Sequence, residues 1–257
     1  SLGAAYVFVR SGTNWIQQAK LRDRNGLQAD RLNTSFGSSV ALAGNTALVG
    51  NEGRGTAVVF VRNGTNWTRQ AELTASDAVA ADPNFFGHAV ALAGNTALVG
   101  NLAATSGGIT AAGAAYVFTR TGATWTQQAI LTASDKAEFD FFGLSVALAG
   151  ETALVGAFGS DPGGTDDAGA AYVFVRSGTA WSEQAKLTAG AKAATDRFGV
   201  SVALSGNTAV AGAFVADPQG IEDAGAAYVF ARNGTAWSQI TKLTAGDMAA
   251  EDLFGAS

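Results

Sequence analysis

The sequence contains no cysteine, one histidine, three prolines and few charged residues. The lack of cysteine excludes a disulfide framework and cysteine-ligated zinc, and a single histidine argues against a histidine-based triad or a multi-histidine metal site. Charged residues make up only 14% of the chain, and the formal net charge of −5 argues against a nucleic-acid partner. No apolar run approaches the ~20 residues that a membrane-spanning helix needs.

The residues that are present form an internal repeat. The 257 residues include 33 glycines and are 47% hydrophobic, and the three prolines and a mean hydropathy of +0.15 argue against bulk disorder. Each repeat carries one tryptophan, and a Phe-Gly pair recurs at spacings of 50, 56, 56 and 56 residues: Phe36-Gly37, Phe86-Gly87, Phe142-Gly143, Phe198-Gly199 and Phe254-Gly255. Self-similarity at a period of about 50 residues indicates a repeat architecture.

Each repeat is predicted to contain four short strands. In one repeat, apolar segments of strand length cover residues 145–149, 152–156, 169–176 and 181–188. Gly150-Glu151 is expected to form the turn between the first two segments, and Ser177-Gly178 the turn between the last two, because glycine provides the positive φ that tight hairpin turns require. A two-residue turn in the last hairpin is expected to place Phe174 opposite Trp181, as a cross-strand aromatic pair.

Four short antiparallel strands in such a unit are typical of a β-propeller blade. The predicted fold is all-β: a single β-propeller domain over residues 1–257, with four complete four-stranded antiparallel blades and half of a fifth. The complete blades are expected to begin near Phe36, Phe86, Phe142 and Phe198. Residues 1–35 are expected to form the partial blade, and 254–257 the start of the next unit.

The incomplete blade has three explanations that the sequence leaves open. The chain is part of a longer propeller, or a five-bladed ring with one half-built blade, or a neighbouring molecule completes the blade by strand addition. The first explanation is favoured, because an open end would expose unpaired edge strands.

The unit resembles the FG-GAP repeat of integrin-α-type propellers, in the form common in bacterial surface and secreted proteins. The residues that carry the resemblance are Phe142-Gly143 followed by residues 145–148, 155–157, 169–174 and 181–187. The resemblance implies a propeller in an extracellular or cell-surface protein, with a role in binding or adhesion. One feature departs from the family: many of its blades carry a calcium loop, Asp-x-Asn-x-Asp-Gly, between the first two strands. Here a two-residue turn stands there, too short to supply six to eight oxygens.

Charge is predicted to separate along the axis of the propeller. In a four-stranded meander, the second–third link and the link to the next blade share one end, and the longer loops are all of these kinds. This long-loop end holds 18 of the 21 acidic residues but only 7 of the 16 basic residues. Such a field steers ligands, whereas the simpler and favoured interpretation is that aspartate suits turns and keeps the protein soluble.

Two matching loops, residues 161–169 and 217–225, are the sharpest candidates for a ligand-binding face. Each spreads three carboxylates among glycines, which suits either turn capping, the favoured interpretation, or a weak calcium site at Asp161, Asp167, Asp217 and Asp223. Phe158 and Phe214 precede the loops as apolar anchors or as buried plugs. The candidate face therefore comprises Phe158, Asp161, Asp166, Asp167, Phe214, Asp217, Glu222 and Asp223.

These observations favour a non-enzymatic binding or adhesion module whose acidic long-loop face binds a protein or a glycan. No catalytic residue is assigned, no cofactor is required, and calcium is the one metal considered. An alternative is a structural scaffold that self-associates by strand addition at the incomplete blade. A second alternative is a propeller glycosidase that uses a pair of loop carboxylates.

Overall fold

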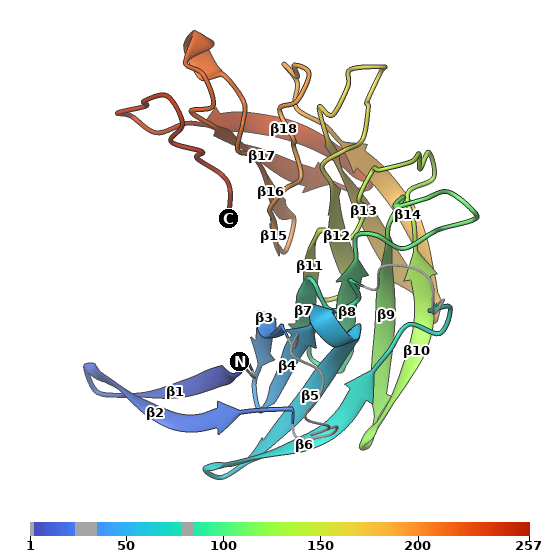
Figure 1. The fold of residues 1–257 in the computed structure, drawn as a ribbon, viewed down its shortest axis with the longest axis vertical. Helices are drawn as coiled ribbons and strands as arrows, with labels where there is room; N and C mark the ends of the chain where they lie inside the picture. The colour runs from blue at the N-terminus through green and yellow to red at the C-terminus, as the bar shows by residue number, and fades with distance from the viewer. Residues whose placement is uncertain (1–2, 24–34, 79–84) are drawn as a thin grey trace.

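The fold is four radial β-sheets and one two-stranded sheet, arranged in an open arc (Figure 1). The computed structural model describes residues 3–23, 35–78 and 85–257. Four charged residues assigned to the long-loop end lie outside the described residues: Arg24, Asp30, Arg31 and Asp82. So do residues 1–2 and 24–34 of the predicted partial blade 1–35. The all-β prediction with four complete four-stranded antiparallel blades is confirmed.

The strands follow one another from the inside to the outside of each blade. The two-stranded sheet is β1 (Ala5–Ser11) and β2 (Asn14–Leu21), and the first complete blade is β3 (Phe36–Ala43), β4 (Thr46–Asn51), β5 (Thr56–Asn63) and β6 (Asn66–Leu73). The next is β7 (Val90–Ala93), β8 (Thr96–Asn101), β9 (Ala114–Thr121) and β10 (Thr124–Leu131). The last two are β11 (Ser145–Ala149), β12 (Thr152–Ala157), β13 (Ala170–Ser177) and β14 (Ala180–Leu187), and β15 (Val202–Ser205), β16 (Thr208–Ala213), β17 (Ala226–Asn233) and β18 (Ala236–Leu243).

The outer hairpin of each blade turns on two residues, but its register differs from the one predicted. Ser177 pairs with Ala180, so Arg176 lies opposite Trp181 and Phe174 lies opposite Glu183. The predicted Phe174–Trp181 pair is therefore wrong, because the two turn residues are Gly178 and Thr179, one position later than the Ser177-Gly178 turn on which the prediction rests. In three blades the equivalent guanidinium lies 5.3–6.0 Å from the indole ring: Arg62 over Trp67, Arg120 over Trp125 and Arg232 over Trp237.

The hydrophobic core lies between the blades. One cluster joins Leu98 and Val117 of one blade to Phe142 and Tyr172 of the next, all of them buried. The rings of Phe142 and Tyr172 meet edge-on, with their centroids 5.6 Å apart. Neighbouring blades thus cover each other's faces, which is why the central strands are apolar on both sides instead of alternating.

The Phe-Gly pair sets how closely two blades approach. Gly156 on β12 packs against the backbone of Gly199, the glycine of the next blade's Phe-Gly pair, and a Cβ on Gly156 would overlap the Gly199 carbonyl. Gly199 itself has a φ of 90°, a conformation that side-chain-bearing residues rarely adopt. Within its own blade its N–H donates to the Gly212 carbonyl at 2.8 Å, and the Phe198 N–H donates to the Ala168 carbonyl of the preceding blade at 3.0 Å. The motif is therefore a backbone contact between blades.

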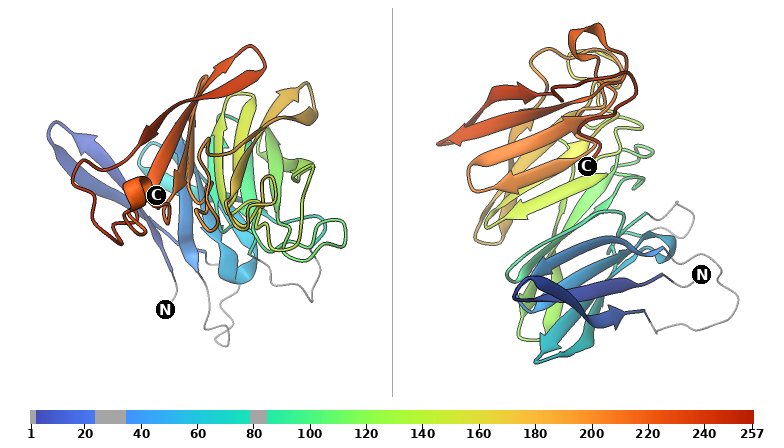
Figure 2. Two further views of the ribbon diagram at one scale, coloured as in Figure 1. Left: turned by 90° about the horizontal axis from the view of Figure 1, so that it is seen from above. Right: turned by 90° about the vertical axis from the view of Figure 1, so that its left-hand side faces the viewer.

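The tight hairpin turns and the longer links lie at opposite ends of the blades (Figure 2). Links of the second–third type include 158–169 and 214–225, and links between blades include 132–144 and 188–201. In Figure 1 the inner strands β3, β7, β11 and β15 lie on the concave side of the arc, and β1–β2 and β15–β18 lie at its two ends. The fold thus presents one long-loop end and two open flanks.

Candidate functional site

The candidate loops are bonded to the next blade through their backbones. The N–H groups of Thr195 and Arg197 donate to the carbonyls of Asp166 and Asp167 at 2.9 and 3.1 Å. In the following blade, Glu251 and Leu253 make the same bonds, at 3.0 Å each, to Glu222 and Asp223. Backbone hydrogen bonds therefore join each acidic loop to the next blade, and most of the carboxylates of the loop are exposed to solvent.

Asp161 and Asp217 cap their own loops. Asp161 Oδ1 accepts the Asp167 N–H at 2.7 Å, and Asp217 Oδ1 accepts the Asp223 N–H at the same distance. Asp167 and Asp223 both have a positive φ, near 48°, which aspartate tolerates better than most residues. These bonds hold the two loops in one shared conformation and occupy one carboxylate oxygen of each capping residue.

Calcium at these positions remains a prediction. Among the described residues, no three Asp, Glu, His or Cys side chains are grouped so that they could hold a metal ion. The links between first and second strands are two-residue turns, as between Ala149 and Thr152. The residues present therefore do not fit the calcium loop that many FG-GAP blades carry between these strands.

Phe158 and Phe214 are joined by residues that the sequence analysis did not single out. The Phe158 ring stacks on Phe141, with centroids 5.0 Å apart and an interplanar angle of 4°. The Arg197 guanidinium lies 5.7 Å from the Phe158 ring and 5.8 Å from the Phe214 ring. Phe139 extends the row at 6.1 Å from Phe141 and is 54% exposed. We call Phe139, Phe141, Phe158, Arg197 and Phe214 the loop-face ladder.

The ladder runs across adjacent blades because two kinds of link alternate in it. Phe158 and Phe214 follow second strands, whereas Phe141 and Arg197 each precede a Phe-Gly pair. Phe141 and Arg197 are half-buried. The Nε of Arg197 is buried and has no hydrogen-bond partner in the part of the chain that the structure describes. The only sequence signal for the loop-face ladder was the large residue, Phe141 or Arg197, directly before the Phe-Gly pair.

A second feature that the sequence analysis missed is a buried aspartate two residues before the Phe-Gly pair. Asp140 and Asp196 are 2% and 5% exposed, and they accept the N–H groups of Ala137 and Ala193 at 2.7 and 2.6 Å. Burial raises the pKa of both carboxyls, against the lowering effect of these bonds. The signal was the Asp-x-Phe-Gly pattern, which occurs at the last three Phe-Gly pairs, and in each of them the aspartate accepts a backbone N–H three residues before it.

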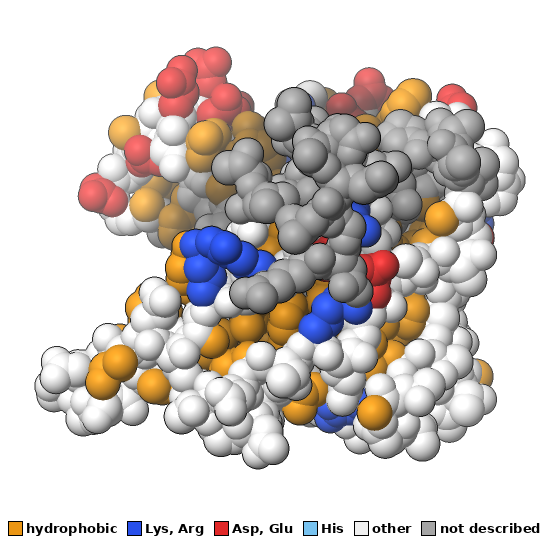
Figure 3. Space-filling model, turned by 60° about the horizontal axis from the view of Figure 1, so that its bottom comes forward, with side chains coloured by type: hydrophobic (Ala, Val, Ile, Leu, Met, Phe, Trp, Pro, Cys, Tyr) orange, Lys and Arg blue, Asp and Glu red, His pale blue; other side chains and the backbone are white. Residues whose placement is uncertain are grey.

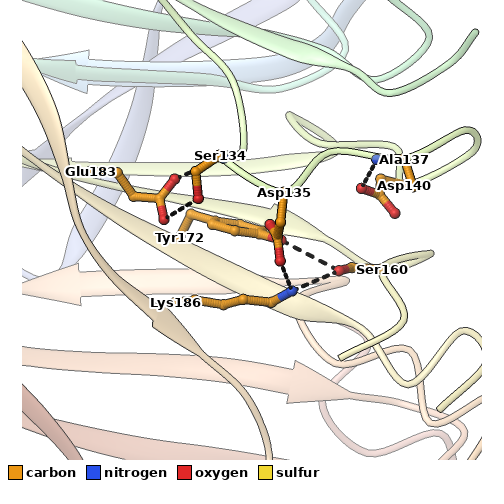
Figure 4. A network of polar contacts seen from close by, with 8 residues as sticks. All are labelled: Ser134, Asp135, Ala137, Asp140, Ser160, Tyr172, Glu183 and Lys186. Atoms are coloured by element: carbon orange, nitrogen blue, oxygen red, sulfur yellow. Dashed lines mark hydrogen bonds and ion pairs between the residues drawn. The ribbon is translucent and has the colours of Figure 1, made fainter. Parts of the chain in front are cut away.

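Asp135 ties two blades together through a polar network (Figure 4). It accepts hydrogen bonds from the Tyr172 hydroxyl at 2.8 Å and from Lys186 Nζ at 2.7 Å, and Lys186 also donates to Ser160 at 3.2 Å. Burial alone would raise the pKa of Asp135, but the bonds from Lys186 and Tyr172 outweigh it and lower that pKa. Burial, and secondarily the bond to Asp135, raises the pKa of the Tyr172 hydroxyl.

The same network is incomplete at the next blade interface. Tyr228 and Lys242 occupy the places of Tyr172 and Lys186, but Ala191 stands where Asp135 does. The Tyr228 hydroxyl is buried and has no hydrogen-bond partner among the described residues. Burial, followed by the nearby Asp196 charge, raises the pKa of Tyr228 to about 12.

Comparison with known proteins identifies the repeat. The sequence model of the FG-GAP repeat matches residues 15–64, 67–118, 125–174 and 181–230. Curated proteins give no match, and over the residues described no helix is both long and apolar enough to cross a membrane. Each match begins on the outer strand of one blade and ends on the third strand of the next or, for the first match, one residue after it. Because these matches cover most of the chain, it belongs to the FG-GAP repeat family.

Proposed function

We propose that this chain is a non-enzymatic binding module of an extracellular or cell-surface protein, and that its long-loop face recognises a protein or a glycan. The observation that carries the proposal is the loop-face ladder, which lies on the same end of the blades as the acidic loops 161–169 and 217–225. The proposed role requires no cofactor.

The ladder and the loop carboxylates offer complementary chemistry. The exposed Phe139 ring provides an apolar surface for a sugar ring or an apolar side chain. The solvent-facing carboxylates accept hydrogen bonds from sugar hydroxyls or pair with lysine and arginine of a protein. In Figure 3, acidic side chains gather along the upper rim of the molecule, whereas the lower edge of the same view shows almost none. A concentrated acidic field of this kind raises association rates for a basic partner.

The test is binding of the labelled chain to a glycan array and to an array of basic peptides. Asp161, Asp167, Asp217 and Asp223 are changed together to asparagine, which keeps the Oδ1 acceptor that caps each loop while removing the charge. We expect affinity for the probes bound by the wild-type chain to fall at least about tenfold, and to fall further with Phe139→Ala.

The matched control is Glu151→Gln, which removes an exposed carboxylate at the tight-turn end of a blade. This control should bind as the wild-type chain does. Equal binding by the quadruple variant and the wild-type chain, or an equal loss in the control, would contradict a ligand site on the long-loop face.

A further inference from the structure

Three successive blade interfaces carry the same buried tyrosine, but only two of them provide it with a carboxylate. The links after the outer strands read Leu-Thr-Ala-Ser-Asp at 73–77 and at 131–135, but Leu-Thr-Ala-Gly-Ala at 187–191. Asp135 accepts the Tyr172 hydroxyl at 2.8 Å, and burial, followed by a bond to Asp77, raises the pKa of Tyr116. At the third interface Tyr228 has no aspartate at this place in the link.

The Tyr228 hydroxyl is an unsatisfied donor in a buried position. Tyr228 is 1% exposed, and among the described residues its hydroxyl has no hydrogen-bond partner. Leaving a buried hydroxyl unpaired is costly, so such groups are rare in folded proteins. The position therefore favours an acceptor that comes from outside the interface.

Lys242 also lacks the acceptors that its equivalent uses. At the preceding interface Lys186 Nζ donates to Asp135 at 2.7 Å and to Ser160 at 3.2 Å (Figure 4). The equivalents of these two acceptors are alanines, Ala191 and Ala216. Over the part of the chain that the structure describes, Lys242 forms no ion pair. Two donors that hold one carboxylate at the preceding interface thus stand here without it.

The rest of the interface keeps the same geometry. The Lys242 ammonium lies 5.6 Å from the centroid of the Tyr228 ring, close to the 5.2 Å between Lys186 and the Tyr172 ring. The link also follows the same course, because the N–H of its fourth residue donates to the outer strand of the next blade in both cases, at 2.9 and 3.0 Å: Gly190 to Gln239 and Ser134 to Glu183. The preceding interface is therefore a template for what this one can hold.

The acidic neighbours are the same at both interfaces. At each of them one buried aspartate interacts electrostatically with the lysine and with an aspartate of the acidic loop: Asp140 with Lys186 and Asp161, and Asp196 with Lys242 and Asp217. Burial would raise the pKa of Asp135, but the bonds from Lys186 and Tyr172 outweigh it and lower that pKa. The two donors thus favour a charged carboxylate in spite of the acidic neighbours.

We propose that Tyr228 and Lys242 form a binding site for the carboxylate group of a small acid or of a uronic acid in a glycan. One oxygen accepts the Tyr228 hydroxyl and the other pairs with Lys242 Nζ, as Asp135 does with Tyr172 and Lys186. Ala191 and Lys242 are exposed, so the ligand enters from solvent past the flexible lysine stem. The site uses no residue of the proposed ligand face or of the loop-face ladder, so either site can fail without the other.

The test is a titration of the full chain, labelled with ¹³C at the ring carbon that bears each tyrosine hydroxyl, with acetate at constant ionic strength and neutral pH. Spectra of Tyr228→Phe and Tyr172→Phe assign the two signals. We expect the Tyr228 signal to shift saturably, with a Kd of about 10 mM or lower. The Tyr172 signal is the internal control and should not move, because Asp135 already occupies its hydroxyl.

Two variants move the site between the interfaces. Ala191→Asp supplies the carboxylate from the link, so it should weaken acetate binding at Tyr228 at least about tenfold. Asp135→Ala should make the Tyr172 signal respond to acetate. The proposal is overturned if the wild-type Tyr228 shift does not saturate, if Ala191→Asp binds acetate equally well, or if the Tyr172 signal of the wild-type chain responds as that of Tyr228 does.

A second ligand identifies the source of the carboxylate. The same titration with methyl glucuronide presents the group on a sugar, and methyl glucoside is the matched control without it. A lower Kd for the glucuronide than for acetate assigns the site to a uronic acid, and an equal or higher Kd assigns it to a small free acid. An equal Tyr228 shift with methyl glucoside would overturn recognition of a carboxylate.

Discussion

At the scale of single residues, Asp135 and Asp140 show how position in one link sets the behaviour of a carboxyl group. Both lie in the link between β10 and β11. Asp135 is half exposed and bonded to a lysine and a tyrosine of the next blade, whereas Asp140 is buried with a backbone N–H as its partner. Their pKa values consequently move in opposite directions from the ordinary value of 3.8.

Opposite pKa shifts predict opposite pH dependences of stability. The folded-state pKa of Asp135 is lowered, so its contribution is fully present above pH 3.8 and is lost as the pH falls through the lowered value. The folded-state pKa of Asp140 is raised, so its contribution is present below pH 3.8 and is lost as the pH rises through the raised value. Urea unfolding of the wild-type chain, Asp135→Asn and Asp140→Asn between about pH 2 and pH 7 measures both. If the two variants differ from wild type in the free energy of unfolding by amounts that change in the same direction with pH, the opposite pKa shifts of Asp135 and Asp140 are contradicted.

The unpaired hydroxyl of Tyr228 predicts a stabilising substitution. Ala191→Asp should restore at this interface the network that Asp135 forms with Tyr172 and Lys186, because Tyr228 and Lys242 are already in place. We expect the free energy of unfolding to rise by about 1 kcal/mol. The gain should disappear in a Tyr228→Phe background, which a double-mutant cycle by urea unfolding measures. An equal gain in both backgrounds would show that Tyr228 is not the partner.

The sequence predicted the residues that act within one unit better than those that act between units. The four strands, the two-residue turns and the capping role favoured for the aspartates of the 161–169 loop all follow from local spacing. The pairing of Arg176 with Trp181 also follows from spacing once the turn residues are counted correctly. The Asp135–Tyr172 bond and the ladder through Arg197 join residues of different blades, and no spacing within one unit reveals them.

At the scale of strands, one hydrogen bond recurs between the outer strands of neighbouring blades. In each case the indole N–H of a tryptophan donates to a glutamine Oε1 of the preceding blade, at 3.0–3.1 Å: Trp67 to Gln18, Trp125 to Gln70, Trp181 to Gln128 and Trp237 to Gln184. On β18 the equivalent residue is Ile240, which is 60% exposed. The bond is a repeated link at the outer rim of the arc.

This link predicts a cost for removing its acceptor. Gln128→Leu leaves the partly buried indole N–H of Trp181 without its partner, so the free energy of unfolding should fall by about 1 kcal/mol. The control is Ile240→Gln, which installs the same acceptor where no tryptophan of the described chain faces it, and it should leave stability within about 0.5 kcal/mol of wild type. Urea unfolding followed by tryptophan fluorescence measures both. Equal effects of the two substitutions would contradict a specific link.

At the scale of the whole molecule, the arc is a row of units that each depend on their neighbours. The blade β11–β14 is covered on both faces, and β12 and the first five residues of β13 are buried throughout. At the two ends equivalent strands lose cover: β1, the equivalent of β13, alternates between half-buried and exposed residues, and β18 is exposed along most of its length, whereas its equivalent β14 is largely half-buried. In such quasi-one-dimensional proteins, local stability is the sum of unit and interface contributions, so it should fall toward both ends.

The decrease in local stability toward the ends of the arc can be measured by comparing β1 with β13, because the two strands have the same sequence. Residues 5–10 and 171–176 share one sequence, so their amides have the same intrinsic exchange rates and differ only in the free energy of local opening. Strand β13 has two paired edges and a covered face, whereas β1 has one paired edge and half-exposed aromatic rings. We expect amide protection in β1 to be at least about a hundredfold lower than in β13, measured by native-state hydrogen exchange on the dilute chain. Comparable protection in the two strands would mean that β1 is covered in solution, and the gradient would then have to be abandoned at that end of the arc.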